Sequence, residues 1–339
     1  MPKKLVIVAL SISLLVIAAC VIYVTWYAPR LRVRKHFPLV ATYQFEVKGH
    51  VPHENYDQFL RDLDLIVDIG FKGVKLWNIE GYYDINLLDE ITRDLKKRNL
   101  VFTLPFQVWR REEFPYNKTV LDGLYAYDER TWERVGFIDF VGKVAAKLKT
   151  KDNMLWYAVH YPFDWSKWEE YKKRFDDPGY KFELQRIINA INQNDGTHPI
   201  YMVLEFPPDF NPPYDLNGIE GFGVQPYSLI NDDIDKTRIN EHLNFLKKRG
   251  NKVYIDEWGV QTEAGFGEYK GTVKHGWASN EESKAKMIEG FVDYILDWEI
   301  VWCYFGLHDH WESDWGIVDL DNSLKKGGEA MKAALHKGL

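Results

Sequence analysis

The stretch KVYIDEWGV, residues 252–260, decides the fold and raises the first question about function. It begins like a buried strand, with β-branched and aromatic residues in succession. It ends in two adjacent acids, Asp256 and Glu257, followed by an aromatic residue and a glycine. A buried acid is costly unless it is paired. Either this strand is exposed, or one of its carboxylates has a chemical role.

Seven other strand-like runs accompany this stretch, and most are continuously apolar, as strands covered on both faces are. They occupy residues 38–47, 71–79, 100–109, 154–163, 198–207, 219–228 and 300–311. Amphipathic stretches between them predict helices over residues 55–70, 84–99, 134–149, 182–194 and 238–250.

This alternation predicts an α/β fold, a single (β/α)8 TIM barrel over residues 37–339. A doubly wound open sheet is the structural alternative. It lacks support, because no glycine-rich phosphate-binding turn follows the first strand.

Composition narrows the possible partners. The net charge of −7, with no basic cluster beyond the N-terminus, argues against nucleic acid. Aromatic residues make up 15% of the chain, which favours ligands with flat faces. The only cysteines, Cys20 and Cys303, do not fix the redox compartment.

The first 36 residues form a separate segment. Residues 5–27 carry no charge, and about 20 apolar residues suffice for a helix to cross a bilayer. We therefore predict an N-terminal transmembrane anchor over residues 5–27, followed by a basic juxtamembrane segment. The alternative is a lipoprotein-type signal in which Cys20 is lipidated, but the run stays apolar for seven residues beyond that cysteine.

The predicted strands end in hydrogen-bonding groups mixed with aromatic rings, and in a barrel of this kind the active site forms at these ends. Polar groups match the hydroxyls of a sugar, and flat rings match its C–H face. The candidates are Trp77, Asn78, Trp109, His160, Tyr161, Glu205, Tyr227, Glu257, Trp258, His308 and Trp311.

The sequence resembles the clan A superfamily of retaining glycoside hydrolases, such as the cellulase and mannanase families, over about residues 38–335. The most specific segment is YIDEWG, which looks like the nucleophile segment of that clan. The resemblance implies that Glu257 attacks the anomeric carbon of the sugar. It also implies that Tyr227 forms a hydrogen bond to Glu257. At the end of the eighth strand, Trp311 would form the floor of the sugar subsite.

The fourth strand departs from the family pattern. The clan normally has Asn-Glu there, whereas this chain has His160 and Tyr161. A retaining mechanism needs two carboxyl groups about 5–5.5 Å apart. Glu205, at the end of the next strand, is the first candidate for the missing acid, and Asp164 is the second. Without a substitute the protein would bind sugar and not cleave it.

Structural roles compete with each of these assignments. Glu257 can be a carboxylate paired with a barrel Lys or Arg, and strand alternation predicts that Asp256 points outward or bonds to backbone. His160 suits either a sugar contact or simple packing. His308 and His310 could share a face as a metal pair, but a third ligand is not evident. We therefore expect no metal site and no cofactor.

The sequence thus predicts a membrane-tethered glycoside hydrolase, and the resemblance implies that it acts on β-linked oligo- or polysaccharides. A carbohydrate-binding pseudoenzyme and a transglycosylase acting on surface glycans are the alternatives. Four of the six basic residues in the first 36 follow the apolar run, and this charge count favours a cytoplasmic domain. Glycan chemistry normally faces outward, so we expect the domain on the extracytoplasmic face.

Overall fold

The structure is a computed structural model of the whole chain. It describes residues 3–24, 38–44, 52, 55–77, 87–107, 125–127, 134–160, 178–205, 216–230, 233–248, 252–262, 276–296, 298, 300–309 and 314–337.

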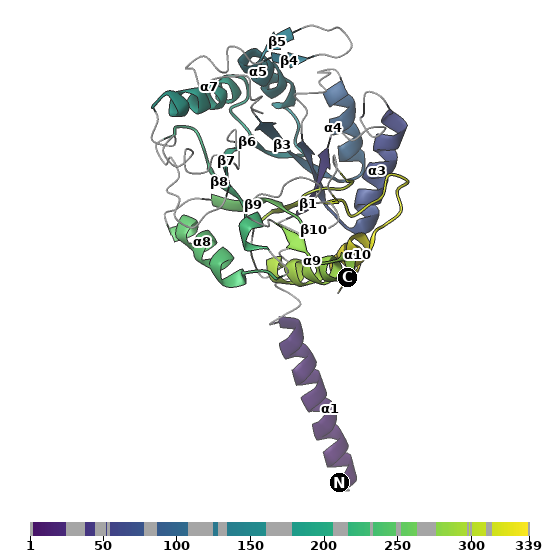
Figure 1. Cartoon of the computed structure of the whole chain (residues 1–339). Coiled ribbons are helices and arrows are strands. Elements are labelled where there is room, and N and C mark those ends of the chain that lie inside the picture. The colour runs from purple at the N-terminus through teal and green to yellow at the C-terminus, as the bar shows by residue number, and fades with distance from the viewer. Residues whose placement is uncertain are drawn as a thin grey trace.

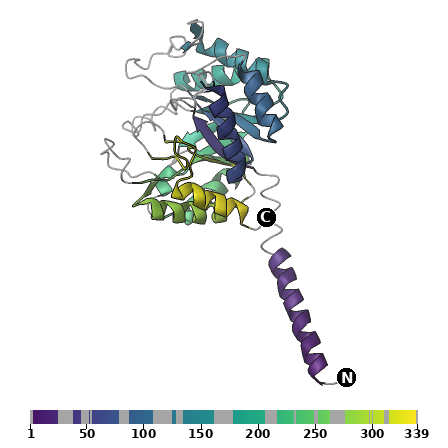
Figure 2. The ribbon, with the colours of Figure 1, turned by 90° about the vertical axis from the view of Figure 1, so that its right-hand side faces the viewer.

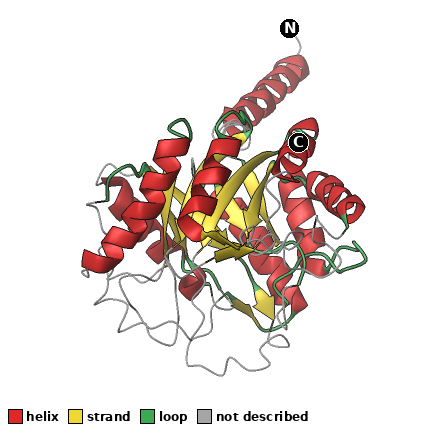
Figure 3. Ribbon diagram, turned by 90° about the horizontal axis from the view of Figure 1, so that it is seen from above, coloured by secondary structure: helices red, strands yellow, loops and turns green. Residues whose placement is uncertain are grey.

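Eight parallel strands close into a barrel in the order β1-β12-β9-β8-β7-β6-β3-β2. Viewed from above, they lie at the centre with helices around them (Figure 3). Their bounds are β1 Leu39–Gln44, β2 Gly73–Trp77, β3 Val101–Gln107, β6 Met154–His160, β7 Ile200–Glu205, β8 Gly221–Gln225, β9 Lys252–Trp258 and β12 Trp302–Tyr304. Each lies within one of the eight predicted runs, so the barrel prediction is confirmed.

The helices pack outside the barrel. Five overlap the predicted amphipathic stretches: α3 Tyr56–Ile69, α4 Leu87–Lys97, α5 Phe137–Leu148, α7 Pro178–Asn194 and α8 Lys236–Lys248. Two more, α9 Glu281–Ile295 and α10 Lys326–His336, lie outside those stretches. Smaller elements are the pair β4 Tyr125–Tyr127 and β5 Arg134–Gly136, the pair β10 Gln261–Thr262 and β11 Trp277–Ala278, and the turn η5 Tyr227–Leu229.

Helix α3 shows how the sequence fixes the ends of an element. The side chain of Asn55 caps its first turn by accepting a hydrogen bond from the backbone N–H of Gln58 at 3.2 Å. Gly70 ends the helix in the left-handed conformation at φ 111°, where a side chain would be strained. The turn at Gly70 leads directly into strand β2.

Two hydrophobic layers divide the core. Side chains that point outward from the strands pack beneath the helices in one large cluster. Inward-pointing residues form a smaller cluster inside the barrel: Val40, Trp156, Ala158, Val203, Tyr254 and Cys303. This smaller cluster does not cover the whole inner face of the barrel. Near the carboxyl ends of the strands, the inner face carries polar side chains, among them the buried residues Lys75 and Asp256.

The N-terminal helix α1, Lys3–Ile22, stands apart from the barrel (Figures 1 and 2). Among the residues that the structure describes, no helix combines the length and the apolar character that crossing a membrane requires. The transmembrane helix predicted over residues 5–27 is therefore not found.

Candidate functional site

The candidate site lies at the carboxyl ends of the barrel strands. Of the predicted site residues, His160 ends β6, Glu205 ends β7, Tyr227 follows β8 and Glu257 is the penultimate residue of β9. Trp77 ends β2. The candidates Asn78, Trp109, Tyr161, Asp164 and Trp311 lie outside the described residues, as does His310.

Glu257 is bound to a buried lysine. Lys75 on β2 donates from Nζ to Oε1 of Glu257 and to Oδ2 of Asp256, each at 2.6 Å. Lys75 is fully buried, and Glu257 is 6% exposed. Glu257 therefore pairs with a barrel cation, as the structural alternative expected. The cation is Lys75, which lies on a strand about 180 residues earlier in the chain.

The expectation that Asp256 points outward is wrong. Its side chain is 1% exposed and lies inside the barrel, where the hydroxyl of Tyr254 donates to Oδ1 at 2.7 Å. An irregularity in the pairing of β9 with β12 explains how both acids reach Lys75. Three steps along β9 match two along β12, which is the count of a β-bulge, and a bulge interrupts strand alternation.

Asp256 is the most highly connected carboxylate of the site. Its Oδ2 also accepts a hydrogen bond from Gln225 Nε2 at 3.0 Å and lies 3.1 Å from Nε2 of His160. Burial alone would raise the pKa of Asp256, but the charges of Lys75 and His160 hold that pKa well below its usual range. Asp256 is therefore an anion.

Lys75 is the matching cation. Burial alone would lower the pKa of Lys75, but the carboxylates of Asp256 and Glu257 raise it above its usual value. Two carboxylates thus share one ammonium group. His160, Asp256 and Glu257 also offer ligand atoms within 4.8 Å of one another, which would suit a metal ion. The ammonium of Lys75 already provides a positive charge to both carboxylates.

A group of aromatic rings lies beside Glu257. The hydroxyl of Tyr227 donates to Oε2 of Glu257 at 3.5 Å, and its ring meets the edge of Trp315 at a centroid distance of 5.2 Å. Phe305, directly after β12, lies 6.1 Å from Trp315 and 5.4 Å from Trp77. Phe305 and Trp315 are half-buried. Tyr227, Trp315, Phe305 and Trp77 thus form a chain of ring contacts that begins beside Glu257.

Two predicted site residues lie away from these groups. Trp258 is buried beneath α9, with its ring 4.1 Å from Phe291 and 4.9 Å from Tyr304. His308 is buried beside α3, with Nε2 at 3.5 Å from Oδ1 of Asp62. Both side chains contribute to the layer between the barrel and its helices.

Glu205 is placed by its backbone alone. It ends β7, and its Cα partner on β8 is Gln225, whose side chain reaches Asp256. This register puts Glu205 at the level of the polar group inside the barrel mouth. It is the only candidate acid besides Glu257 that lies within the described residues.

Sequence reasoning missed Lys75, Gln225, Phe305 and Trp315. For Lys75 a signal was present, since a lysine in the middle of an apolar strand run is rarely buried without a partner. Trp315 follows the last strand by eleven residues, and its proximity to Tyr227 depends on how the intervening segment folds back.

Solved structures similar to this chain are glycoside hydrolases with low sequence identity. They include a β-D-glucuronidase from Dictyoglomus thermophilum, with 14% identity and a TM-score of 0.59 over 89% of this chain and 51% of that one. A GH5_18 protein from Streptomyces cattleya in complex with GlcNAc has 15% identity and a TM-score of 0.59, over 89% and 80% of the two chains. A GH10 endoxylanase from a sugarcane soil metagenome has 12% identity and a TM-score of 0.55, over 89% and 98%.

This chain therefore spans about half the length of the glucuronidase that it resembles. No family model and no curated protein matches the sequence. At these identities the likeness establishes the fold, an eight-stranded parallel barrel shared with glycoside hydrolases.

Proposed function

We propose that this protein is a glycoside hydrolase that cleaves β-linked glycans with retention of configuration and uses Glu257 as its nucleophile. One observation carries the proposal: Glu257 lies at the carboxyl end of its barrel strand, next to Tyr227 and a group of aromatic rings. The glycosidase character of the structural neighbours agrees with it.

The mechanism has two steps. A carboxylate oxygen of Glu257 attacks the anomeric carbon while an acid protonates the departing glycosidic oxygen, so that a glycosyl–enzyme ester forms and the aglycone leaves. Water then attacks the same carbon, the former acid takes the proton of that water, and the ester breaks to release the sugar and the Glu257 carboxylate.

Lys75 serves this chemistry by holding the nucleophile in place. Its Nζ lies 2.6 Å from Oε1 of Glu257 and 2.6 Å from Oδ2 of Asp256. A carboxylate held in this way is oriented before the substrate binds, which lowers the cost of aligning it with the anomeric carbon.

Glu205 is the favoured acid and base in this proposal. It ends β7 at the level of Gln225, and Gln225 contacts Asp256, one of the two acids that Lys75 binds. Asp164 remains the second candidate. His160 ends β6, at the position where the resembling family has asparagine, and its side chain lies next to Asp256.

The test is turnover of nitrophenyl β-glycosides of glucose, galactose, mannose, xylose and glucuronic acid by the full chain. We expect Glu257→Gln to lose activity roughly a thousandfold or more. Glu220→Gln is the matched control, because Glu220 is exposed at the opposite end of the barrel and pairs with Lys252. A fluorinated glycoside that traps the ester should label Glu257 in the peptide mass spectrum.

Azide separates the two candidate acids. If Glu205 is the acid and base, azide restores turnover to Glu205→Ala and yields a β-glycosyl azide, while Asp164→Ala is not rescued. Turnover that persists in Glu257→Gln would remove Glu257 from the mechanism.

The alternative is a protein that binds a glycan without cleaving it. The ion pair of Glu257 with Lys75 and the histidine at the end of β6 both favour this alternative. It predicts calorimetric binding of β-linked oligosaccharides with no release of reducing ends, and equal binding by wild type and Glu205→Ala.

A further inference from the structure

The contact between Tyr227 and Glu257 depends on where the tyrosine is held. Its hydroxyl lies 3.5 Å from Oε2 of Glu257, which is the upper limit for a hydrogen bond. A small displacement of the ring would therefore break the contact. The groups that fix Tyr227 also fix the donor that faces the proposed nucleophile.

The backbone of Tyr227 is tied to the start of β11. The N–H of Gly276 donates to the carbonyl of Tyr227 at 3.0 Å, and the N–H of Trp277 donates to the carbonyl of Ile230 at 3.2 Å. The first residue of η5 and the residue after its last thus accept hydrogen bonds from two successive residues of one short segment. The position of η5 therefore follows the position of that segment.

Gly276 is in turn fixed by β10. Its carbonyl accepts the N–H of Gln261 at 2.7 Å, and β10 pairs with β11 through Gln261 and Thr262. Gly276 has φ +57°, and a Cβ atom there would lie 2.6 Å from the carbonyl oxygen of Gly259. A residue with a side chain would therefore shift this backbone. Tyr227 is thus connected to β10 through a closely packed glycine.

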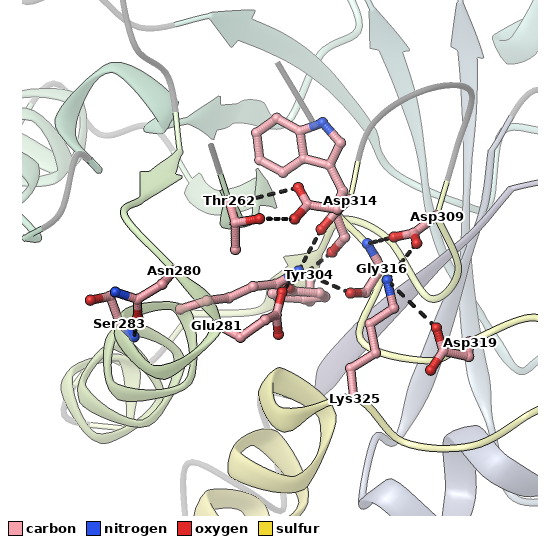
Figure 4. A network of polar contacts seen from close by, with 12 residues as sticks. Thr262, Asn280, Glu281, Ser283, Tyr304, Asp309, Asp314, Gly316, Asp319 and Lys325 are labelled. Atoms are coloured by element: carbon pink, nitrogen blue, oxygen red, sulfur yellow. Dashed lines mark hydrogen bonds and ion pairs between the residues drawn. The ribbon is translucent and has the colours of Figure 1, made fainter. Parts of the chain in front are cut away.

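Strand β10 is only two residues long, and a side chain from outside the strand holds its last residue. The carboxylate of Asp314 accepts the backbone N–H of Thr262 at 2.8 Å and also accepts its hydroxyl (Figure 4). Thr262 is buried, and Asp314 is half-buried. Because a two-residue strand makes few hydrogen bonds of its own, these contacts fix the place where β10 ends.

Asp314 itself is anchored from α9. Lys284 on α9 is buried and donates to the carbonyl of Asp314 and, at 3.0 Å, to that of Gly316. The hydroxyl of Tyr304 donates to the carbonyl of Trp315 between them at 3.3 Å. The carboxylate that holds Thr262 is therefore presented by a backbone that is fixed to the core.

A second route joins Asp314 to Tyr227. The next residue, Trp315, meets the ring of Tyr227 edge-on at a centroid distance of 5.2 Å. A Cβ atom on Gly276 would lie 2.7 Å from the same tryptophan ring. Asp314 thus acts on the tyrosine from two sides, through β10 and Gly276 on its backbone and through Trp315 on its ring.

We infer that Asp314 is a positioning residue that sets Tyr227 against Glu257 by holding Thr262. Asp314 acts on the nucleophile only through the tyrosine. Its effect on turnover rests on the proposed function, whereas its effect on the position of Tyr227 does not. A displacement of about 1 Å can cost on the order of a hundredfold in rate, so a smaller displacement should cost about tenfold.

Fluorine NMR measures the position of Tyr227 without turnover. With 3-fluorotyrosine incorporated into the full chain, the Tyr227 signal is assigned by its loss in Tyr227→Phe. The signal should shift in Glu257→Gln, because the hydroxyl contacts that carboxylate. Asp314→Ala should shift or broaden the same signal, since Thr262 loses both contacts.

Conservative variants and a control sharpen the comparison. Asp314→Asn keeps an acceptor for the N–H of Thr262 and should leave the signal close to its wild-type position. Thr262→Val loses the hydroxyl contact and should move the signal, whereas Thr262→Ser keeps that contact and should not. Asp319→Asn is the matched control, because Asp319 is an exposed acid of the same segment that pairs with Lys325.

Turnover gives a second readout. On nitrophenyl glycosides, Asp314→Ala should lower kcat about tenfold in the wild type and change it little in Tyr227→Phe, which lacks the hydroxyl. A purely structural role would lower kcat by the same factor in both backgrounds. Asp319→Asn should keep the kcat of the wild type.

Two results would overturn the role of Asp314. One is a Tyr227 signal that stays in place in Asp314→Ala, and the other is an equal loss of kcat in both backgrounds. Absence of turnover by the wild type would remove the proposed function, and the fluorine signal alone would then decide the positioning role. If Asp314→Ala does not fold, the signals of Thr262→Val and Thr262→Ser decide it.

Discussion

At the scale of single residues, the site depends on one buried lysine between two acids. The side chain of Lys75 has no exposed surface, and those of its carboxylate partners, Asp256 and Glu257, are almost completely buried. A buried ion pair loses much of its Coulomb gain to desolvation, whereas loss of one partner leaves an uncompensated charge. The arrangement is thus better explained by the positioning of Glu257 than by stability.

Substitutions at Lys75 and Asp256 should differ in their effect on activity. Lys75→Met removes the cation that holds Glu257 in place, so kcat/KM should fall about a hundredfold. Asp256→Asn leaves the contact between Lys75 and Glu257 and should cost less. The measurement is kcat/KM on the best nitrophenyl glycoside.

Stability provides the check on that comparison. Lys75→Met alone should cost about 3–5 kcal/mol, because it leaves buried carboxylates without their cation. The double variant Lys75→Met/Asp256→Asn should recover part of that loss in urea unfolding. Equal losses of kcat/KM in the two single variants would contradict the role given to Lys75.

At the scale of elements, β9 and α9 carry the site together. The bulge in β9 turns Asp256 and Glu257 toward the same lysine, and α9 supplies the lysine that supports Trp315. Helix α9 begins with Asn280, whose side chain accepts the N–H of Ser283 at 2.9 Å. This N-cap fixes the start of α9 four residues before Lys284.

Removing this cap tests how far the site depends on α9 as a whole. Asn280→Ala should lower the free energy of unfolding by about 1 kcal/mol, the usual cost of an N-cap. Because Lys284 lies one turn inside the helix, KM should stay close to that of wild type. A large rise in KM with an unchanged unfolding midpoint would show that the cap at Asn280 itself shapes the candidate functional site.

At the scale of the whole molecule, a buried polar group connects the strands of the barrel to the outer helices. Asp195, fully buried after α7, accepts hydrogen bonds from Tyr157 and Thr197 and lies 2.7 Å from Nδ1 of His198. Burial by itself would raise the pKa of Asp195, but these hydrogen bonds lower it to about 2. The group links α5, β6 and the start of β7 far from Glu257.

Acid unfolding should therefore involve this residue. Its pKa lies below the ordinary value, so the unfolded chain binds its proton first as the pH falls. The stabilisation is complete above about pH 4 and is lost as the pH falls through about 2, with a magnitude on the order of 2 kcal/mol. Asp195→Asn should flatten that part of the stability profile in urea titrations, whereas Asp152→Asn, at an exposed aspartate paired with Lys96, should change it far less.

Much of the architecture could be predicted because parallel barrel strands leave a plain signal. Strands covered on both faces are continuously apolar, and all eight runs contain a barrel strand. The position of Glu257 at a strand end was predictable for the same reason. That the adjacent acids Asp256 and Glu257 would both reach Lys75 was not predictable, because it depends on an offset between β9 and β12 that neither strand encodes alone.

The sequence by itself determined the strand count, the helical layer and the end of the barrel where Glu257 emerges, since these follow from local periodicity and chain order. Only the tertiary structure decided that Lys75 would meet Glu257 and that Trp315 would lie against Tyr227. Those contacts join residues from distant parts of the chain, and barrel closure and the packing of the segment after β12 set their geometry.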